Sequence, residues 1–237
     1  MSNQALIEVP DDGDRTLAEF YDRASAELHD LHFEILTWLS RAVTDRGWLE
    51  SVERVTERLA DSGLGTAAEV GAAIAELQHR RLLSIDQSGA KFTGLLGAIS
   101  LAPTKHRAHL DNGIDIHTFG GMDLLTLHAM LHKPLDLHTV CPVSGRAVTM
   151  RVADSRVVTA SPAGVAGFWS FWDGSRPLAE VAAHSPLFAD DEALAAWEKA
   201  HPSLKGLALP ADLLLWVGLE AAAELGALRF KLIGYSG

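Results

Sequence analysis

Histidine is concentrated in one central stretch of this sequence. Six of the 11 histidines lie between residues 106 and 138, namely His106, His109, His117, His128, His132 and His138. His128 and His132 are four residues apart, so on a helix both imidazoles would share one face, as two metal ligands do. No glutamate accompanies them in a zinc-protease pattern. The sequence requires no cofactor, and this pair is the metal site it offers; the alternative is that both are core or solvent-facing side chains.

Asp123 lies in the same stretch, before an apolar run that predicts a helix over residues 124–131. Burial and the start of that helix would set the pKa of its carboxyl group, which could then act as a general acid or base. The alternative is that Asp123 only caps the helix. Gly120 and Gly121 could admit a substrate close to the backbone, or form an ordinary turn.

Two further features could take part in chemistry. The imidazole of His184 could take part in proton transfer near neutral pH, unless it is simply a loop histidine. Trp169 and Phe171 would share one face of a strand, opposite Trp172, as core residues or as a wall for a flat organic ligand. The sequence contains no phosphate loop, dinucleotide fingerprint or paired CxxC motif.

Helices and one hairpin are predicted for the first half of the chain. Residues 1–14 are acidic and carry Pro10 and Gly13, so we expect them to form a flexible lead-in. Apolar residues spaced three and four apart predict a helix over residues 17–39. A second helix is expected to begin after the cap Ser51 and to end at the glycines 63 and 65, and the capping box of Thr66 and Glu69 predicts the start of a third. Residues 83–93 are expected to form a β-hairpin. Three helices and a hairpin are the order of a winged helix, so we predict a winged-helix-like domain over residues 15–100.

The second half, residues 101–237, has the pattern of a small α+β domain. Strands are expected at residues 137–143 and 146–152, around a Ser144-Gly145 turn, and at 156–159 and 165–172. Helices are expected at residues 190–200 and 211–225, the second buried against the sheet.

Composition and charge limit the partners of this chain. With 48% hydrophobic and 22% charged residues it is expected to be globular, and its formal charge is −11. Residues 1–100 hold nine Lys or Arg and 17 Asp or Glu, so the winged-helix-like part would repel DNA. We expect a cytoplasmic protein, because there is one cysteine, no signal peptide and no membrane span. The expected partner is a small-molecule substrate, and the sequence does not decide whether the chain forms a homodimer.

Four blocks of the second half resemble the alkylmercury lyase (organomercurial lyase) family. They are FGGMD at 119–123, HTVCPVSGRAV at 138–148, TASPAG at 159–164 and WEKAHPSLKGLA at 197–208. With the helical start, the resemblance spans most of the chain. It implies an α+β fold, in which an N-terminal winged-helix-like helical domain packs on a C-terminal mixed β-sheet domain with helices.

The resemblance also implies a catalytic mechanism, and this chain lacks some of the residues that the mechanism needs. Members of the family cleave a carbon–mercury bond with two cysteines, which take the mercury, and an aspartate, which passes a proton to the departing carbon. The aspartate is Asp123, but the first cysteine falls on Gly120 and the second on Ala182 or Ala183, beside His184. Cys141 matches a non-catalytic cysteine of the family.

Imidazole and carboxylate groups do not replace two soft thiolates for a soft metal, so we expect organomercurial cleavage to be lost or weak. The first hypothesis is a lyase or isomerase that uses Asp123, with His184 as its partner. Its substrate is a small organic molecule, held in space left by the lost side chains and lined by Phe119, Gly120, Gly121, Ala182 and Trp169. The alternatives are a non-enzymatic metal- or ligand-sensing protein and a genuine organomercurial lyase.

Overall fold

The structure is a computed structural model, and it describes residues 28–171 and 178–227. It begins with three helices, which are α2 (Asp30–Arg46), α3 (Val52–Asp61) and α4 (Ala67–His79). The predicted caps are confirmed. The hydroxyl of Ser51 accepts the N–H of Arg54 at the start of α3, and Thr66 and Glu69 bond each other reciprocally at the start of α4. Each contact satisfies N–H groups that have no partner inside the helix.

The helix expected over residues 17–39 does not run through that range. α2 begins at Asp30, after His29, whose extended backbone (φ −105°, ψ 169°) is not helical. The N–H of His29 donates to Nδ1 of His32, which fixes this start. The earlier part of the predicted helix and the lead-in lie outside the described residues. Apolar spacing continues across a cap without change, so it did not reveal the break.

The predicted hairpin is confirmed and leads into a large sheet. β1 (Leu83–Ile85) pairs antiparallel with β2 (Phe92–Leu95), and Asp86 N–H bonds the Lys91 carbonyl in the turn. β2 then pairs with β3 (Ile99–Ser100), which pairs with β5 (Asp115–Thr118). One sheet therefore crosses from the helical half into the second half. The helix–helix–helix–hairpin order is present, while the winged-helix identification and the boundary at residue 100 stay predictions.

The main sheet has eight strands in the order β1-β2-β3-β5-β4-β6-β7-β8, so it is larger than the small sheet expected. Its remaining strands are β4 (Arg107–Leu110), β6 (Leu135–Val140), β7 (Ala147–Ala153) and β8 (Arg156–Ser161). The antiparallel pairing of β6 with β7 confirms the predicted hairpin, but its connection is longer than the two-residue turn expected at Ser144-Gly145, because β6 ends at Val140 and β7 begins at Ala147. β3, β4 and β5 were missed, because strands of two to four residues give too few alternations to be recognised.

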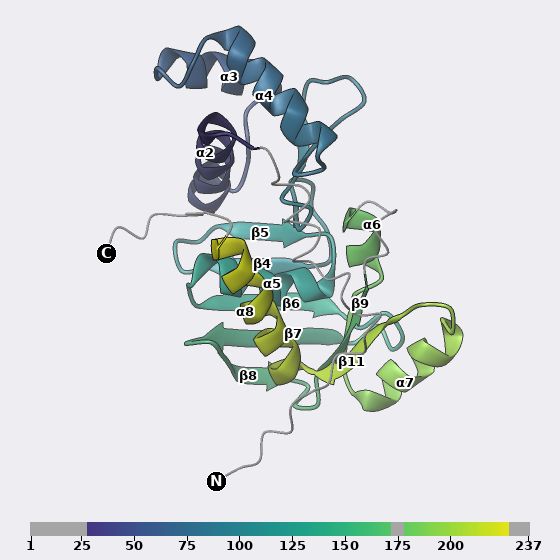
Figure 1. Ribbon diagram of the computed structural model, residues 1–237. Coiled ribbons are helices and arrows are strands. Elements are labelled where there is room, and N and C mark those ends of the chain that lie inside the picture. The colour runs from purple at the N-terminus through teal and green to yellow at the C-terminus, as the bar shows by residue number, and fades with distance from the viewer. Residues whose placement is uncertain (1–27, 172–177, 228–237) are drawn as a thin grey trace.

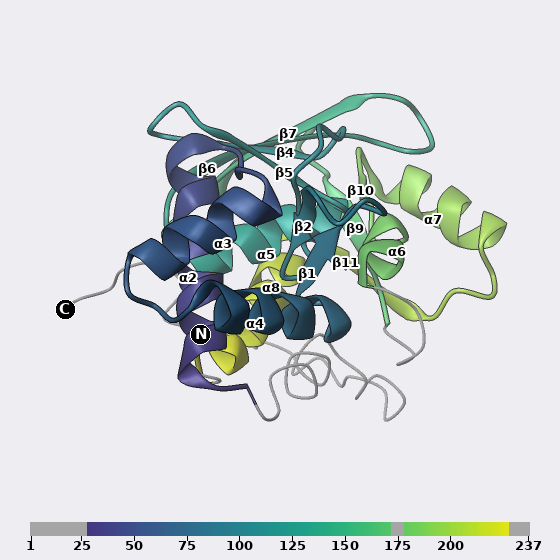
Figure 2. The same cartoon turned by 90° about the horizontal axis from the view of Figure 1, so that it is seen from above.

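A second sheet and the remaining helices complete the α+β architecture. The sheet has the order β10-β9-β11, and its strands are β9 (Ala166–Ser170), β10 (Leu187–Phe188) and β11 (Gly206–Pro210). The helices are α5 (Gly121–Leu131), α6 (Leu178–Ala183), α7 (Asp191–Ala200) and α8 (Ala211–Ala227). Figure 1 shows α5 and α8 on one face of the main sheet, and Figure 2 shows no described helix on its other face.

α8 is only partly buried, which corrects the expectation of a buried helix. It packs against α5 and against β8, β9 and β11. Leu214 and Leu215 are fully buried there, whereas Leu213 and Trp216 on its outer side are exposed. No helix in the described parts of the chain is long and apolar enough to span a bilayer.

Candidate active site

Asp123 lies in the first turn of α5, directly after β5 leads into that helix. Gly120 is the N-cap residue, and Oδ2 of Asp123 accepts its N–H at 2.9 Å. This contact is one half of a capping box, so the capping role considered from the sequence is present. A cap does not exclude chemistry, because only one carboxyl oxygen is used in this hydrogen bond.

The carboxyl group of Asp123 has an unusual pKa. Its surroundings desolvate the charged form and raise the pKa to about 8, although the N–H of Gly120 acts in the opposite direction. The residue still keeps some accessible surface. Asp123 is therefore a carboxylic acid that favours its protonated form at neutral pH.

Gly120 and Gly121 leave no room for a larger side chain. A Cβ atom at Gly120 would overlap the carbonyl oxygen of Ala182 and lie 2.7 Å from its carbonyl carbon. A Cβ atom at Gly121 would lie 2.8 Å from the backbone nitrogen of Leu187. The expectation that these glycines open space for a substrate is wrong, because the backbone at Ala182 and Leu187 lies directly against them. What they provide is close contact between two backbone segments.

Ala182, near the end of α6, is the residue that faces Gly120. It is buried, whereas Ala183 is exposed. The two positions on which the resemblance places the catalytic thiols are thus brought together, and Ala182 rather than Ala183 makes the contact. Asp123 belongs to the same site, since it is hydrogen-bonded to Gly120.

Ser185 connects the segments around Gly120 and Ala182 through hydrogen bonds, a role that the sequence did not reveal. Its carbonyl accepts the N–H of Met122 at 3.0 Å, and its own N–H bonds the Ala182 carbonyl at 2.9 Å. Its buried hydroxyl accepts the N–H of Ser170 at 3.1 Å and donates to the Val181 carbonyl at 3.2 Å. One residue thereby ties α6 to the start of α5 and to β9. A serine before a proline in a loop gives no signal of such a role.

Thr118 at the end of β5 is a second residue that the sequence did not reveal. It is fully buried, and its hydroxyl donates to the Gly120 carbonyl at 2.8 Å. The Thr118 carbonyl in turn accepts the hydroxyl of Thr104 at 2.8 Å. These bonds hold Gly120, the residue whose N–H bonds Asp123.

His184 is next to this contact in sequence, but no hydrogen bond joins it to Asp123. Its backbone N–H bonds the Val181 carbonyl at 3.0 Å, and its side chain is half-buried. A role for His184 in proton transfer stays a prediction.

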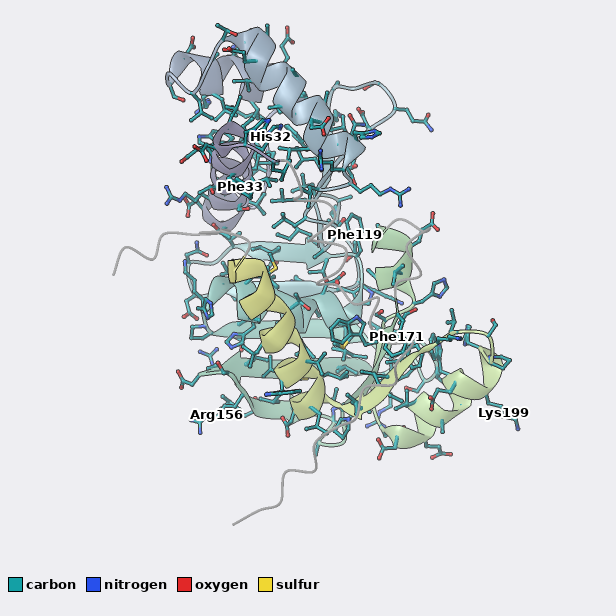
Figure 3. All side chains as sticks on the ribbon, viewed as in Figure 1. His32, Phe33, Phe119, Arg156, Phe171 and Lys199 are labelled. Carbon is teal, nitrogen blue, oxygen red and sulfur yellow. The ribbon has the colours of Figure 1, made fainter. Side chains whose placement is uncertain are left out.

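The aromatic candidates are divided between two places. The N–H of Phe119 bonds the Ala98 carbonyl at 3.0 Å, and its ring packs on Gly94 of β2, where an added Cβ would lie 2.7 Å from Cζ. Figure 3 labels Phe119 near α6, below the helical part of the chain. Trp169 on β9 is partly buried against the core, and Trp172 lies outside the described residues. A substrate-binding role for Phe119 and Trp169 stays a prediction.

The shared helix face expected for His128 and His132 is not formed. His128 is buried, and its Nδ1 lies 2.7 Å from the Lys133 carbonyl oxygen, while burial lowers the pKa of the imidazole. His132 is exposed and is the C-cap residue of α5, with φ 50°, so it has left the helix. The described residues include no group of three or more His, Cys, Asp or Glu that could hold a metal ion.

The other central histidines also have structural partners. Nδ1 of buried His106 lies 2.7 Å from the Thr139 hydroxyl, and burial, followed by the charge of Lys105, lowers its pKa to about 4. His109 pairs with Asp115 at 2.8 Å. His109, His117 and His138 lie on the neighbouring strands β4, β5 and β6, and among the described residues no metal-holding group forms from these side chains.

Cys141 does not belong to the contact between Gly120 and Ala182. It is a buried, free cysteine at the end of β6. Burial raises the pKa of its thiol, but hydrogen bonds from Ser144 and from the backbone of Ala189 and Val143 outweigh this and lower it. The thiol therefore lies between the turn after β6 and the segment that follows β10.

Comparison with known proteins gives a consistent result for this half of the chain. The family model for alkylmercury lyase, MerB, matches residues 99–222. A crystal structure described as the mercury-bound form of MerB2 superposes with a TM-score of 0.73, at 21% sequence identity, over 90% of this chain and 98% of that chain. At this identity the match shows a shared fold. None of the curated proteins compared with the chain matches it.

Proposed function

The chain belongs to the alkylmercury lyase family, and from this we propose a lyase-like enzyme in which Asp123 gives a proton to a carbon atom of a small organic substrate. The observation that carries the proposal is the pKa of Asp123, raised to about 8 by desolvation, at the contact between Gly120 and Ala182. Roughly nine in ten such groups are protonated at pH 7, so the favoured role is that of a general acid.

Asp123 and its hydrogen-bond partner suffice for one proton-transfer step. As the bond between the reacting carbon and its leaving group breaks, the bonding electron pair stays on the carbon and takes the proton from the carboxyl group. The leaving group departs as a neutral unsaturated molecule, as carbon dioxide does when a carboxylate is the leaving group. The carboxylate that remains accepts the N–H of Gly120, which stabilises the new charge. A proton from water, or from His184, then restores the acid. The same step could serve a lyase or an isomerase.

Organomercurial cleavage is proposed to be lost or weak. The family reaction needs two thiolates, and this chain has Gly120 and Ala182 where the resemblance places them. The backbone contact adds a steric reason, because even a Cβ atom at position 120 would overlap the Ala182 carbonyl oxygen. Restoring the first cysteine would therefore require α6 to move away.

An assay with an alkylmercury compound tests this part of the proposal. We expect purified protein to release no hydrocarbon above the level found without protein, measured by gas chromatography of the headspace. Steady turnover by the wild-type chain would show that thiol-independent cleavage survives, and the proposal of altered chemistry would fall.

Solvent isotope exchange tests the proton transfer itself. The protein is incubated in D₂O with a panel of small organic acids and carbonyl compounds, and deuterium bound to carbon is measured by mass spectrometry. We expect incorporation into at least one class with the wild type and none with Asp123→Asn. Incorporation that is equal in the two proteins would exclude Asp123 as the donor.

The metal-sensing alternative lacks support from the geometry. The side chains of His128 and His132 do not converge. His128 contacts the Lys133 carbonyl and His132 is the C-cap residue of α5, so neither residue needs a metal ion to hold it there. A regulatory role of the winged-helix-like half through DNA binding stays a prediction, and the acidic charge of that half disfavours it.

A further inference from the structure

The main sheet ends in an open strand edge at β8. β8 is the last strand in the sheet order, so beyond its pairing with β7 it has no neighbouring strand in the described parts of the chain. Four of its six residues are exposed. An open edge presents unpaired N–H and C=O groups, which can bond a strand of another chain.

A bulge limits how much of this edge is regular. Val158 has no partner on β7, because the register shifts between Arg151 and Val152. The regular stretch that remains is residues 159–161. Two short paired strands are not stable by themselves in water. A partner that pairs with β8 therefore needs further contacts beside the strand.

Apolar side chains beside the edge can supply such contacts. Val158 is 47% exposed, Leu213 40% and Trp216 53%. Leu213 and Trp216 are three residues apart on α8, so they share one side of that helix. Val158 and Asp212 line the same cavity of about 340 Å³, which places Val158 near the start of α8. We call Val158, Leu213 and Trp216 the apolar patch. Exposed apolar groups of this kind mark contact sites between proteins, and tryptophan is frequent among their strongest contacts.

Charges of opposite sign lie at the two ends of β8. Arg156 begins the strand and is exposed, and Figure 3 labels it at the lower edge of the main sheet. Asp191 and Asp212 are exposed and line the cavity beside β8. The N–H of Ala211 bonds the Val165 carbonyl at 3.1 Å, which places Asp212 past the other end of the strand. Within the described residues, none of these three charged side chains has an ion-pair or hydrogen-bond partner.

We propose that the open edge of β8 and the apolar patch bind a second copy of this chain across a two-fold axis. Antiparallel pairing of two β8 strands brings the Arg156 end of each strand to the Ser161 end of the other. Arg156 of each copy then lies beside Asp191 and Asp212 of the partner subunit, and the two apolar patches cover each other.

The surface favours a second copy over a different protein because it is complementary to itself. A two-fold contact requires one surface to carry both members of every interaction. Here one surface carries the strand edge, the apolar patch and charges of both signs. The charges matter, because two chains of formal charge −11 repel each other unless opposite charges meet where the chains touch.

Sedimentation of the full chain over a range of concentrations tests the dimer. We expect the mass to rise from 25.5 kDa toward twice that value as the concentration increases. Arg156→Glu should weaken the dimer about ten-fold or more, because like charges then face each other. Trp216→Ser should weaken it by about as much, because it removes the largest side chain of the apolar patch. Arg54→Glu makes the same charge change on the exposed side of α3 and should dimerise as the wild type does.

An exchange of charges between two variants gives the sharpest test. Asp212→Arg alone should also weaken the dimer. Mixing it with Arg156→Glu should restore dimers, because positions 156 and 212 then carry opposite charges at both contacts of the mixed pair. Two misfolded variants could not produce this recovery.

Three outcomes would each overturn the dimer. They are a chain that stays monomeric at every concentration, a dimer that neither Arg156→Glu nor Trp216→Ser weakens, and a mixture that is no more dimeric than its components. Assembly beyond two chains would also contradict it, because a two-fold contact is closed. Asp123→Asn should dimerise as the wild type does, so the dimer can be tested independently of the proposed function.

Discussion

At the scale of single residues, Asp123 shows how surroundings change a common side chain. Aspartate at the start of a helix usually has a lowered pKa, because the N–H groups there favour the charged form. Here desolvation outweighs that effect, and the pKa rises to about 8. The energetic result is a group that the folded chain prefers to keep neutral, and this preference can be measured without knowing a substrate.

The stability of the protein should therefore depend on pH through Asp123. The pKa is near 3.9 in the unfolded chain and about 8 in the folded one, so between these values the folded state binds the extra proton. Stability from this group is complete below about pH 4 and decreases as the pH rises toward 8. Asp123→Asn cannot ionise and should flatten this decline between pH 5 and 8, measured as the free energy of unfolding in urea.

Asp86→Asn is the control for that measurement. Backbone and side-chain hydrogen bonds hold the pKa of Asp86 below its usual range, so its contribution is lost only in acid. This variant should keep the wild-type decline between pH 5 and 8. A decline that is equally steep in Asp123→Asn would show that the carboxyl group is not the desolvated acid described above.

Gly120→Ala should destabilise the protein by about 1–3 kcal/mol or more, because the new Cβ atom would overlap the Ala182 carbonyl oxygen. Gly71→Ala on α4 is the matched control, since nothing lies within 4 Å of its Cβ position. Alanine is the better helix former there, so this change should stabilise by up to about 1 kcal/mol. Equal free energies of unfolding for the two variants would contradict the close contact between α5 and α6.

At the scale of elements, the candidate site depends on how the segment from α6 to β10 is held against α5. Ser185 contributes four hydrogen bonds to this attachment, two from its backbone and two from its hydroxyl. Thr118 fixes the other side, through the Gly120 carbonyl. Two of these contacts, from Met122 and Ser170 to Ser185, join residues that are distant in sequence, so no local motif reveals them. Together with the local bonds they set the distance between Gly120 and Ala182.

Ser185→Ala should loosen this attachment. It removes the hydroxyl that accepts the buried Ser170 N–H, and an unpartnered buried donor costs about 1–3 kcal/mol. We expect faster hydrogen exchange at the amides of Ser170 and Met122, measured by NMR. Ser203→Ala, at an exposed position, should change neither amide. Unchanged exchange in Ser185→Ala would show that other contacts hold α6 in place.

At the scale of the whole molecule, the two halves of the chain share one sheet. The hairpin from the helical half continues through β3 to β5, and the buried hydrophobic residues of both halves form one cluster. A domain boundary at residue 100 would fall directly after β3, inside this sheet. Shared hydrogen bonds and a shared core couple the two halves energetically.

Unfolding should therefore be a single cooperative transition. Far-ultraviolet circular dichroism and tryptophan fluorescence, followed in the same urea titration, should give coincident curves. Tryptophans occur in both halves, among them Trp38 and Trp197, so two independent domains would be detected. Two separated midpoints would contradict the coupling and support the division predicted from the sequence.

The sequence by itself determined the features that depend on local rules. The caps at Ser51 and Thr66, the hairpin around residues 86–89 and the β6–β7 pairing follow from side chains that act within a few residues. The α+β class and the family also follow from residues that can be seen in the sequence, and so does the lack of cysteine at positions 120 and 182.

Only the tertiary structure decided what those residues do. It showed that Gly120 and Gly121 close a space rather than open one, that His128 and His132 diverge at the end of a helix, and that burial raises the pKa of Asp123. The physical reason is common to all three. Steric overlap, ligand convergence and desolvation depend on atoms that are distant in sequence, and no spacing rule within one segment contains them.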